Sequence, residues 1–159
     1  PKLSKQRVVI HFTASPDRLN KLRPFINSLL DQTVRVDEIA LSIPYKNMKD
    51  VPPWLKKVVA IHGYSRDYDD AGKLIPVALR EKEADTKIII VEPDRVYGQD
   101  FIQEMIEQSD NNPNMVIRTS DDAIIQYLYG EDGAFPMSSG YERAINLDRE
   151  MEKLKNKKK

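Results

Sequence analysis

Two groups of polar residues, each directly after an apolar run, have types and spacing that could do chemistry. Glu92 and Asp94 are separated by one proline and follow the run 88–91, which reads Ile-Ile-Ile-Val. Two carboxylates at this spacing can both reach one hard cation such as Mg²⁺ or Mn²⁺, which would bridge to a diphosphate. The alternative is a solvated strand end in which Asp94 only starts a turn.

The second group is segment 13–18, Thr-Ala-Ser-Pro-Asp-Arg, which follows the apolar run 8–12. Its hydroxyls and the helix start that follows them could hold an anion or a nucleobase. The sequence has no glycine-rich motif of the dinucleotide-binding or P-loop type, so the usual signature of those phosphate sites is missing. His11 and His62 fall on predicted strands, where we expect core or strand-edge residues rather than ligands. We expect Trp54 to be a packing residue rather than a platform for a sugar.

The spacing of apolar residues predicts the elements that must position these groups. The β-branched run 7–13 predicts a buried strand, and segment 16–32 predicts a helix with Ser15 as its N-cap and a kink or delayed start at Pro24. The remaining predicted elements are strands 37–43, 57–61, 86–91 and 115–118, helices 73–83 and 99–109, a packed loop over 51–55, and a hairpin or loop followed by an amphipathic helix after residue 120. Strands alternating with helices predict an α/β fold with a three-layer α/β/α, mostly parallel sheet. Ligands bind outside the carboxyl ends of the strands in such sheets, which is where both polar groups fall.

The composition narrows the class of protein. A chain of 159 residues is expected to form one domain, and its 25 Lys and Arg balance its 25 Asp and Glu, which argues against a surface devoted to nucleic acid. The absence of cysteine excludes disulfide scaffolds, zinc ribbons, iron–sulfur clusters and thiol nucleophiles. No apolar run approaches the ~20 residues of a membrane span, and residues 1–6 lack the apolar stretch of a secretory signal. We therefore expect a cytoplasmic protein without an integral membrane segment.

Taken in order, these segments resemble the GT-A glycosyltransferases, specifically the family-2-like branch found in large DNA viruses and bacteria. The resemblance covers roughly residues 7–118 and depends most on segment 70–76, Asp-Ala-Gly-Lys-Leu-Ile-Pro, and on the strand ahead of the acidic pair. It implies a GT-A, Rossmann-like nucleotide-diphospho-sugar transferase fold over residues 1–159. Within it, 7–118 would be the nucleotide-sugar-binding core, and 119–159 a short acceptor-side segment with a basic C-terminal helix. A viral member would work in the host cytoplasm.

The resemblance also implies a reaction and its residues. In such enzymes an Asp-x-Asp motif at this strand end holds Mn²⁺ or Mg²⁺ against the diphosphate of a nucleotide-sugar donor, so Glu92 and Asp94 would be the metal ligands. The donor would be a UDP- or GDP-sugar, and the acceptor a glycan or glycoprotein. The residues implied to contact the nucleotide or its diphosphate are Thr13, Ser15, Arg18, Ser42, Tyr45, Arg66 and Lys73. An inverting enzyme needs one general base near the acceptor hydroxyl, and Asp122 and Asp132 are the candidates.

Two other functions stay open. The first carboxylate of the acidic pair is one methylene longer than in Asp-x-Asp, and Pro93 fixes φ between the two. These departures, with the short C-terminal part, favour a non-catalytic GT-A-like module that binds a partner or a glycan. A flavodoxin- or receiver-like signalling domain is disfavoured, because such domains need acidic residues after the first strand, where this chain has segment 13–15, Thr-Ala-Ser.

Overall fold

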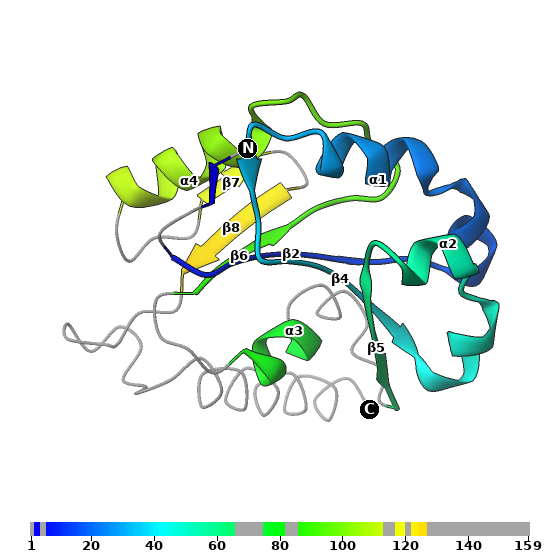
Figure 1. Cartoon of the computed structure of the whole chain (residues 1–159). Helices are drawn as coiled ribbons and strands as arrows, with labels where there is room; N and C mark the ends of the chain where they lie inside the picture. Colours follow the sequence, from blue (N-terminus) through cyan, green and yellow to red (C-terminus); the bar gives the residue numbers. More distant parts are fainter. Residues whose placement is uncertain are drawn as a thin grey trace.

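The computed structural model describes residues 2–3, 6–65, 75–81, 86–112, 117–119 and 122–126. A six-stranded sheet with the order β5-β4-β2-β6-β8-β7 forms its centre (Figure 1). The strands are β2 (Val8–Thr13), β4 (Glu38–Pro44), β5 (Ala60–Tyr64), β6 (Lys87–Ile90), β7 (Ile117–Thr119) and β8 (Asp122–Gln126). Neighbouring strands among the first four run parallel, whereas β8 is antiparallel to both β6 and β7. The predicted α/β class and the mostly parallel sheet are confirmed.

Helices lie on both sides of this sheet. Helices α1 (Arg23–Leu30) and α4 (Phe101–Asn111) lie over one face, and the short α3 (Ile75–Arg80) lies on the other (Figure 1). The connecting segments form two 3-10 helices, η1 (Pro16–Lys21) and η2 (Tyr45–Asp50), and the single-turn α2 (Pro53–Lys56). A two-residue parallel pair joins β1 (Lys2–Leu3) to β3 (Val34–Arg35). No helix in the described part of the chain has the length and apolar character needed to cross a membrane.

The main core lies between the sheet and helices α1 and α4, which cover one of its faces. Successive side chains of a strand point to opposite faces, and Val8, Ile10 and Phe12 belong to the cluster that includes Phe25 of α1. The rings of Phe12 and Phe25 meet edge to face with their centroids 4.9 Å apart. Polar side chains of β2 and β4 are thereby left to the opposite face, where they can serve a site.

Three of the predicted elements differ from the structure. The helix expected over 16–32 is divided into η1 and α1, and α1 begins one residue before Pro24, as a delayed start requires. The loop expected over 51–55 was wrong at its end, because Pro53 begins α2, and proline is well suited to a first helical position. The strand expected at 57–61 begins at residue 60 instead, because the carbonyl of Leu55 accepts the N–H groups of residues 58 and 59 and closes a turn there.

The chain after residue 115 agrees with the sequence in part. A strand is predicted over 115–118 and a hairpin or loop after it, and β7 and β8 pair as antiparallel neighbours. Before this region, the predicted helices 73–83 and 99–109 correspond to α3, which is shorter, and to α4. The predicted amphipathic C-terminal helix lies outside the described residues.

Candidate functional site

The order of the strands reverses beside β2. The connection from β2 leads outward to β4 and β5 on one side, and the chain then returns to place β6 on the other side of β2. In open α/β sheets such a reversal opens a crevice outside the carboxyl ends of the strands, and ligands bind there. Thr13 is level with Ser42, and His11 is level with Ile90, so Glu92 lies two residues further along at the same edge. The ends of β4, β2 and β6 therefore line one rim.

The turn after β2 forms the middle of this rim. Thr13 is half-buried at the end of β2, Ser15 is the exposed N-cap of η1, and Arg18 is exposed within η1. The N–H of Arg18 donates to the carbonyl of Ser15 over 3.0 Å, which closes the turn. The three residues implied by the resemblance thus share one turn at the carboxyl end of β2.

A cavity of about 440 Å³ continues the rim at the ends of β4 and β5. Its lining residues are Ser42, Tyr45, Ile61, His62, Gly63, Tyr64, Pro76 and Arg80. The volume falls within the range of small-ligand sites. Gly63 lies close under the ring of Tyr45 and beside Met48, so that a Cβ atom at this position would collide with both side chains. The structure brings Ser42 and Tyr45, both predicted from the sequence, to one cavity.

Two histidines support the floor and wall of this cavity. Ser42 Oγ and His11 Nε2 are joined by a hydrogen bond of 2.6 Å, and both side chains are buried. His62 lies on β5, lines the cavity, and has its Nε2 3.0 Å from Glu38 Oε1. The prediction that His11 is a core residue is confirmed, and His62 is a half-buried residue of the edge strand.

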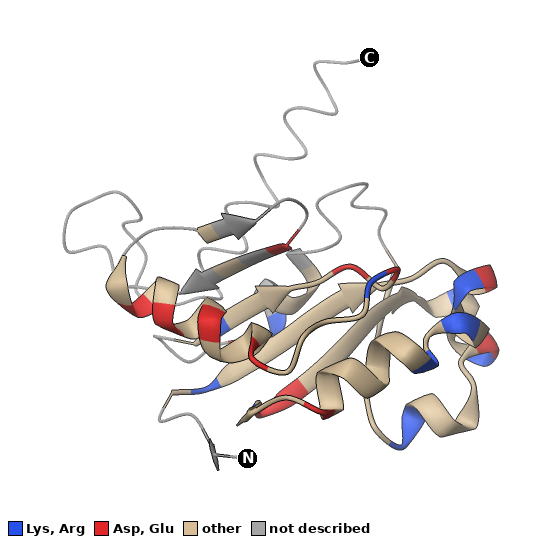
Figure 2. Ribbon diagram, turned by 90° about the horizontal axis from the view of Figure 1, so that it is seen from above, with Lys and Arg blue, Asp and Glu red and all other residues tan. Residues whose placement is uncertain are grey.

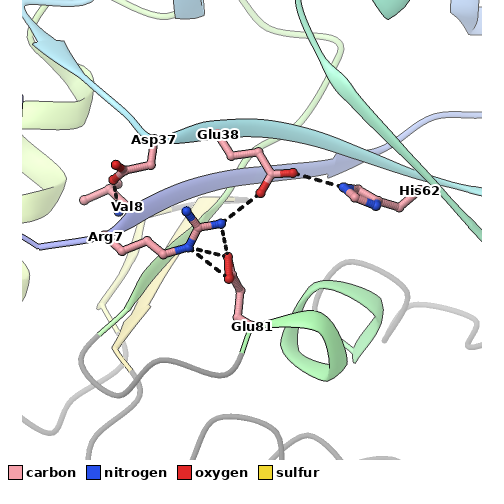
Figure 3. Close-up of polar contacts among 6 residues, drawn as sticks. All are labelled: Arg7, Val8, Asp37, Glu38, His62 and Glu81. Carbon is pink, nitrogen blue, oxygen red and sulfur yellow. Dashed lines mark hydrogen bonds and ion pairs between the residues drawn. The ribbon is translucent and has the colours of Figure 1, made fainter.

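A network of charged side chains fixes α3 against the sheet (Figure 3). Arg7 Nε donates to both carboxylate oxygens of Glu81, over 2.8 and 3.1 Å, and Arg7 Nη2 donates to Glu38 over 3.1 Å. The hydrogen bond to Glu81 is the main reason that the pKa of Arg7 lies above its ordinary value. The network joins residue 81, just after α3, to β4 and to the residue before β2. It therefore holds in place the helix that supplies Pro76 and Arg80 to the cavity.

Arg80 brings a cation to the cavity wall. Its Nη2 is buried and has no hydrogen-bond partner in the described part of the chain. Burial lowers the pKa of the Arg80 guanidinium, although Glu38 and Glu81 act in the opposite direction. Sequence reasoning did not single out Arg80, because an arginine near the end of a helix also suits the helix dipole.

Removal of Glu81 is expected to destabilise the fold. Glu81→Ala leaves Arg7 with Glu38 alone, and we expect the free energy of unfolding in urea to fall by about 1–3 kcal/mol. Breaking a fully buried pair costs about 3–5 kcal/mol, and the partial exposure of Arg7, 32 %, reduces this figure. Asp50→Ala is the matched control, because it removes an exposed carboxylate whose only contact among the described residues is a weak 3.4 Å hydrogen bond from the Asn47 side chain. Equal stability of the two variants would contradict a supporting role for the network.

The acidic pair occupies the loop after β6, at the third part of the rim. Glu92 is half-buried and Asp94 is exposed. The described residues contain no group of three or more His, Cys, Asp and Glu side chains that could hold a metal ion. Two carboxylates nevertheless suit Mg²⁺, which proteins often bind through one or two carboxylates together with water and substrate phosphates. The donor set therefore fits a cation that arrives with a diphosphate.

Tyr97 and Asp122 lie behind the acidic loop. Asp122 begins β8 and is 3 % exposed, and its Oδ1 accepts a hydrogen bond of 2.6 Å from the hydroxyl of Tyr97. Its Oδ2 lies 3.6 Å from Arg95 Nη1. Asp122 thus lies at the edge of the sheet where the site was predicted. Tyr97 and Arg95 engage both of its carboxylate oxygens. Sequence reasoning did not identify Tyr97; its only signal was an aromatic residue three positions after Asp94.

The Tyr97 hydroxyl predicts a loss of stability in alkaline solution. Burial, and then the hydrogen bond to Asp122, raise the pKa of Tyr97 above its ordinary value of about 10. The unfolded chain therefore releases this proton at a pH at which the folded protein retains it, so the stabilisation is complete below about pH 10 and decreases as the pH rises further. Urea unfolding at about pH 9 and about pH 11 is expected to show a larger fall in stability for the wild type than for Tyr97→Phe. Equal falls would contradict this assignment.

The charges near the rim are unevenly distributed. Each of η1 and η2 carries two Lys or Arg residues and one Asp, and α2 carries Lys56, whereas α4 carries acidic residues and no Lys or Arg (Figure 2). Because η1 and η2 directly follow β2 and β4, part of this positive charge lies next to the carboxyl ends of those strands. This distribution favours an anionic ligand near β2 and β4 and leaves the acidic pair as the negative part of the rim.

Three predicted site residues, Arg66, Lys73 and Asp132, lie outside the described residues. The other predicted site residues lie at one edge of the sheet. They belong to the turn after β2, to the cavity at β4 and β5, to the acidic loop after β6, and to the start of β8.

Comparison of the sequence with models of protein families found no match, and comparison with curated proteins found none either.

Proposed function

We propose that this protein is a metal-dependent glycosyltransferase with a three-layer GT-A fold. It would bind a nucleoside-diphosphate sugar together with Mn²⁺ or Mg²⁺ and transfer the sugar to a glycan or protein acceptor. The supporting observation is the row of groups along the rim. A cavity lies at β4 and β5, hydroxyls and the guanidinium of Arg18 follow β2, and two carboxylates follow β6. A nucleobase, a ribose and a diphosphate follow one another in the same order.

The residues of the rim have separate tasks in this proposal. Ser42 and Tyr45 would contact the base and the ribose in the cavity, while Thr13, Ser15 and Arg18 would bind the part of the nucleotide that crosses β2. Glu92 and Asp94 would hold the cation, and Arg66 or Lys73 would add positive charge beside the diphosphate. A cation held by Glu92 and Asp94 would neutralise charge on the leaving nucleoside diphosphate, so that C1 of the sugar could develop oxocarbenium character.

The general base of an inverting reaction must reach the acceptor hydroxyl. Asp122 is buried, and Tyr97 and Arg95 contact its two carboxylate oxygens, so it is poorly placed for this task. Asp132 is the other candidate, and we propose it as the base. Removing the carboxylate of Asp132 should then stop transfer without weakening the binding of the donor.

The alternative is a GT-A-like module that has kept the fold to bind a partner or a glycan. It is favoured by the Glu-Pro-Asp sequence, because Pro93 restricts how the two carboxylates can be oriented. Such a module needs neither a nucleotide nor a cation. The two functions therefore differ in one measurable property, the cation-dependent binding of a nucleotide.

Isothermal titration calorimetry with UDP, GDP and their sugar conjugates tests the proposal. We expect one nucleotide to bind in the presence of Mn²⁺ and to lose its binding when the metal is removed with EDTA. Hydrolysis of one donor sugar over others would then identify the substrate. If no nucleotide binds with or without Mn²⁺, the enzyme is ruled out and the binding module is supported.

A further inference from the structure

The loop between β6 and α4 is fixed to α1 by buried polar contacts. Gln32, which is 6 % exposed, donates through Nε2 to the carbonyl of Gly98 over 2.6 Å. Its Oε1 accepts the N–H of Ile102 over 3.0 Å. The N–H of Tyr97 donates to Ser28 Oγ over 3.0 Å. The C-terminal half of the loop is therefore held by Ser28 of α1 and by Gln32, two residues after the end of α1.

Tyr97 transmits this order to the acidic half of the loop. Its ring is 9 % exposed and packs between Phe25 and Phe101, with centroids 6.2 and 4.3 Å away. Its hydroxyl oxygen accepts the N–H of Glu92 over 2.9 Å and donates its proton to Asp122 Oδ1 over 2.6 Å. The Asp122 carboxylate thus orients the Tyr97 hydroxyl, and the hydroxyl in turn holds the backbone of Glu92.

We propose that Tyr97 and Asp122 are positioning residues that preorganise Glu92 and Asp94 for the cation. The hydrogen bond to the Glu92 N–H fixes the peptide plane from which this side chain leaves the sheet. The backbone at Glu92 is then held in place before a cation arrives. A loop ordered before the ligand arrives avoids the entropic cost of ordering it on binding.

This positioning role rests on the proposed function, because it takes the acidic pair as the cation ligands. It assigns Asp122 a task other than that of the general base. The two tasks differ in what a conservative change does. Asp122→Asn keeps an acceptor oxygen for the Tyr97 hydroxyl and should retain most of the cation affinity, whereas Asp122→Ala should lose it.

Binding of Mn²⁺ in the presence of UDP or GDP, whichever nucleotide the wild type binds, provides the test. Tyr97→Phe keeps the ring but removes the hydroxyl, and we expect Mn²⁺ to bind about tenfold more weakly, the lower end of what changes behind metal ligands cost. The amide of Glu92 should also exchange its hydrogen faster than in the wild type. Ser109→Ala is the matched control, because it removes a buried hydrogen bond, to Lys87, at the opposite end of β6.

The possible outcomes separate the two levels of inference. Failure of the wild type to bind Mn²⁺ with any nucleotide would overturn the proposed function, and the positioning role with it. Wild-type binding with an unchanged Mn²⁺ affinity in Tyr97→Phe would overturn only the positioning role. An equal loss of affinity in Ser109→Ala would show a general effect of lower stability and would also overturn it.

Discussion

Asp94→Ala is expected to abolish cation-dependent nucleotide binding while leaving the fold intact. Asp94 is exposed in the turn after β6, and it forms no hydrogen bond or ion pair with other described residues. Its removal should therefore change the free energy of unfolding by no more than about 0.5 kcal/mol. Loss of one of two carboxylate ligands should weaken Mn²⁺ binding by more than the roughly 10- to 100-fold that changes behind the ligands cost. Calorimetry with and without Mn²⁺ measures the loss of binding, and urea unfolding measures the change in stability.

Glu104→Gln is a suitable control for this prediction. Glu104 is an exposed carboxylate in the first turn of α4, so the change removes the same charge without touching the rim. Its nucleotide affinity should equal that of the wild type. If Asp94→Ala also bound the nucleotide as the wild type does, and still required Mn²⁺, the cation would have to be held elsewhere.

The elements that carry the rim were readable from the sequence. The runs before Thr13 and Glu92 are β-branched and continuous, which is typical of strands buried on both faces. Their carboxyl ends follow from chain direction alone, so the acidic pair and the hydroxyl turn could be assigned to one edge without coordinates. Ser42 and Tyr45 came from the resemblance to the GT-A glycosyltransferases, and they mark the end of the adjacent strand.

The parts that could not be predicted depend on contacts between distant segments. Tyr97 meets Ser28 across 69 positions and Asp122 across 25. Nothing in a local pattern distinguishes a tyrosine that orders a loop from one that packs at random. Asp122 illustrates the consequence: its residue type suggested a base, whereas its burial and its partners favour a positioning role.

Short segments between the main elements were the second source of error. Pro52 and Pro53 excluded a regular strand, but a proline pair can also begin a helix, and α2 does so. The turn that follows delays β5 to residue 60, and this shift places His62 and Gly63 at the cavity. β5 correspondingly extends to Tyr64, three residues beyond the predicted end of this strand.

Phe25→Ala is expected to have the largest effect on stability. Phe25 is 1 % exposed, and its ring meets Phe12 of β2 at 4.9 Å and Tyr97 at 6.2 Å, so it joins α1, the sheet and the acidic loop. Truncating a buried phenylalanine costs about 3–5 kcal/mol, which is a large part of the ~5–15 kcal/mol that stabilises a typical domain. The urea midpoint should therefore fall steeply.

Leu30→Ala is the matched control, because Leu30 lies on the same helix and is 51 % exposed. Its midpoint should change little, since alanine is also the better helix former. Equal midpoints for the two variants would mean that the cluster around Phe25 is not the core.

Phe25→Leu adds a functional test, because it keeps most of the apolar volume but removes the ring beside Tyr97. If that ring helps to hold the loop, Mn²⁺ affinity should fall by a larger factor than the loss of stability alone would cause.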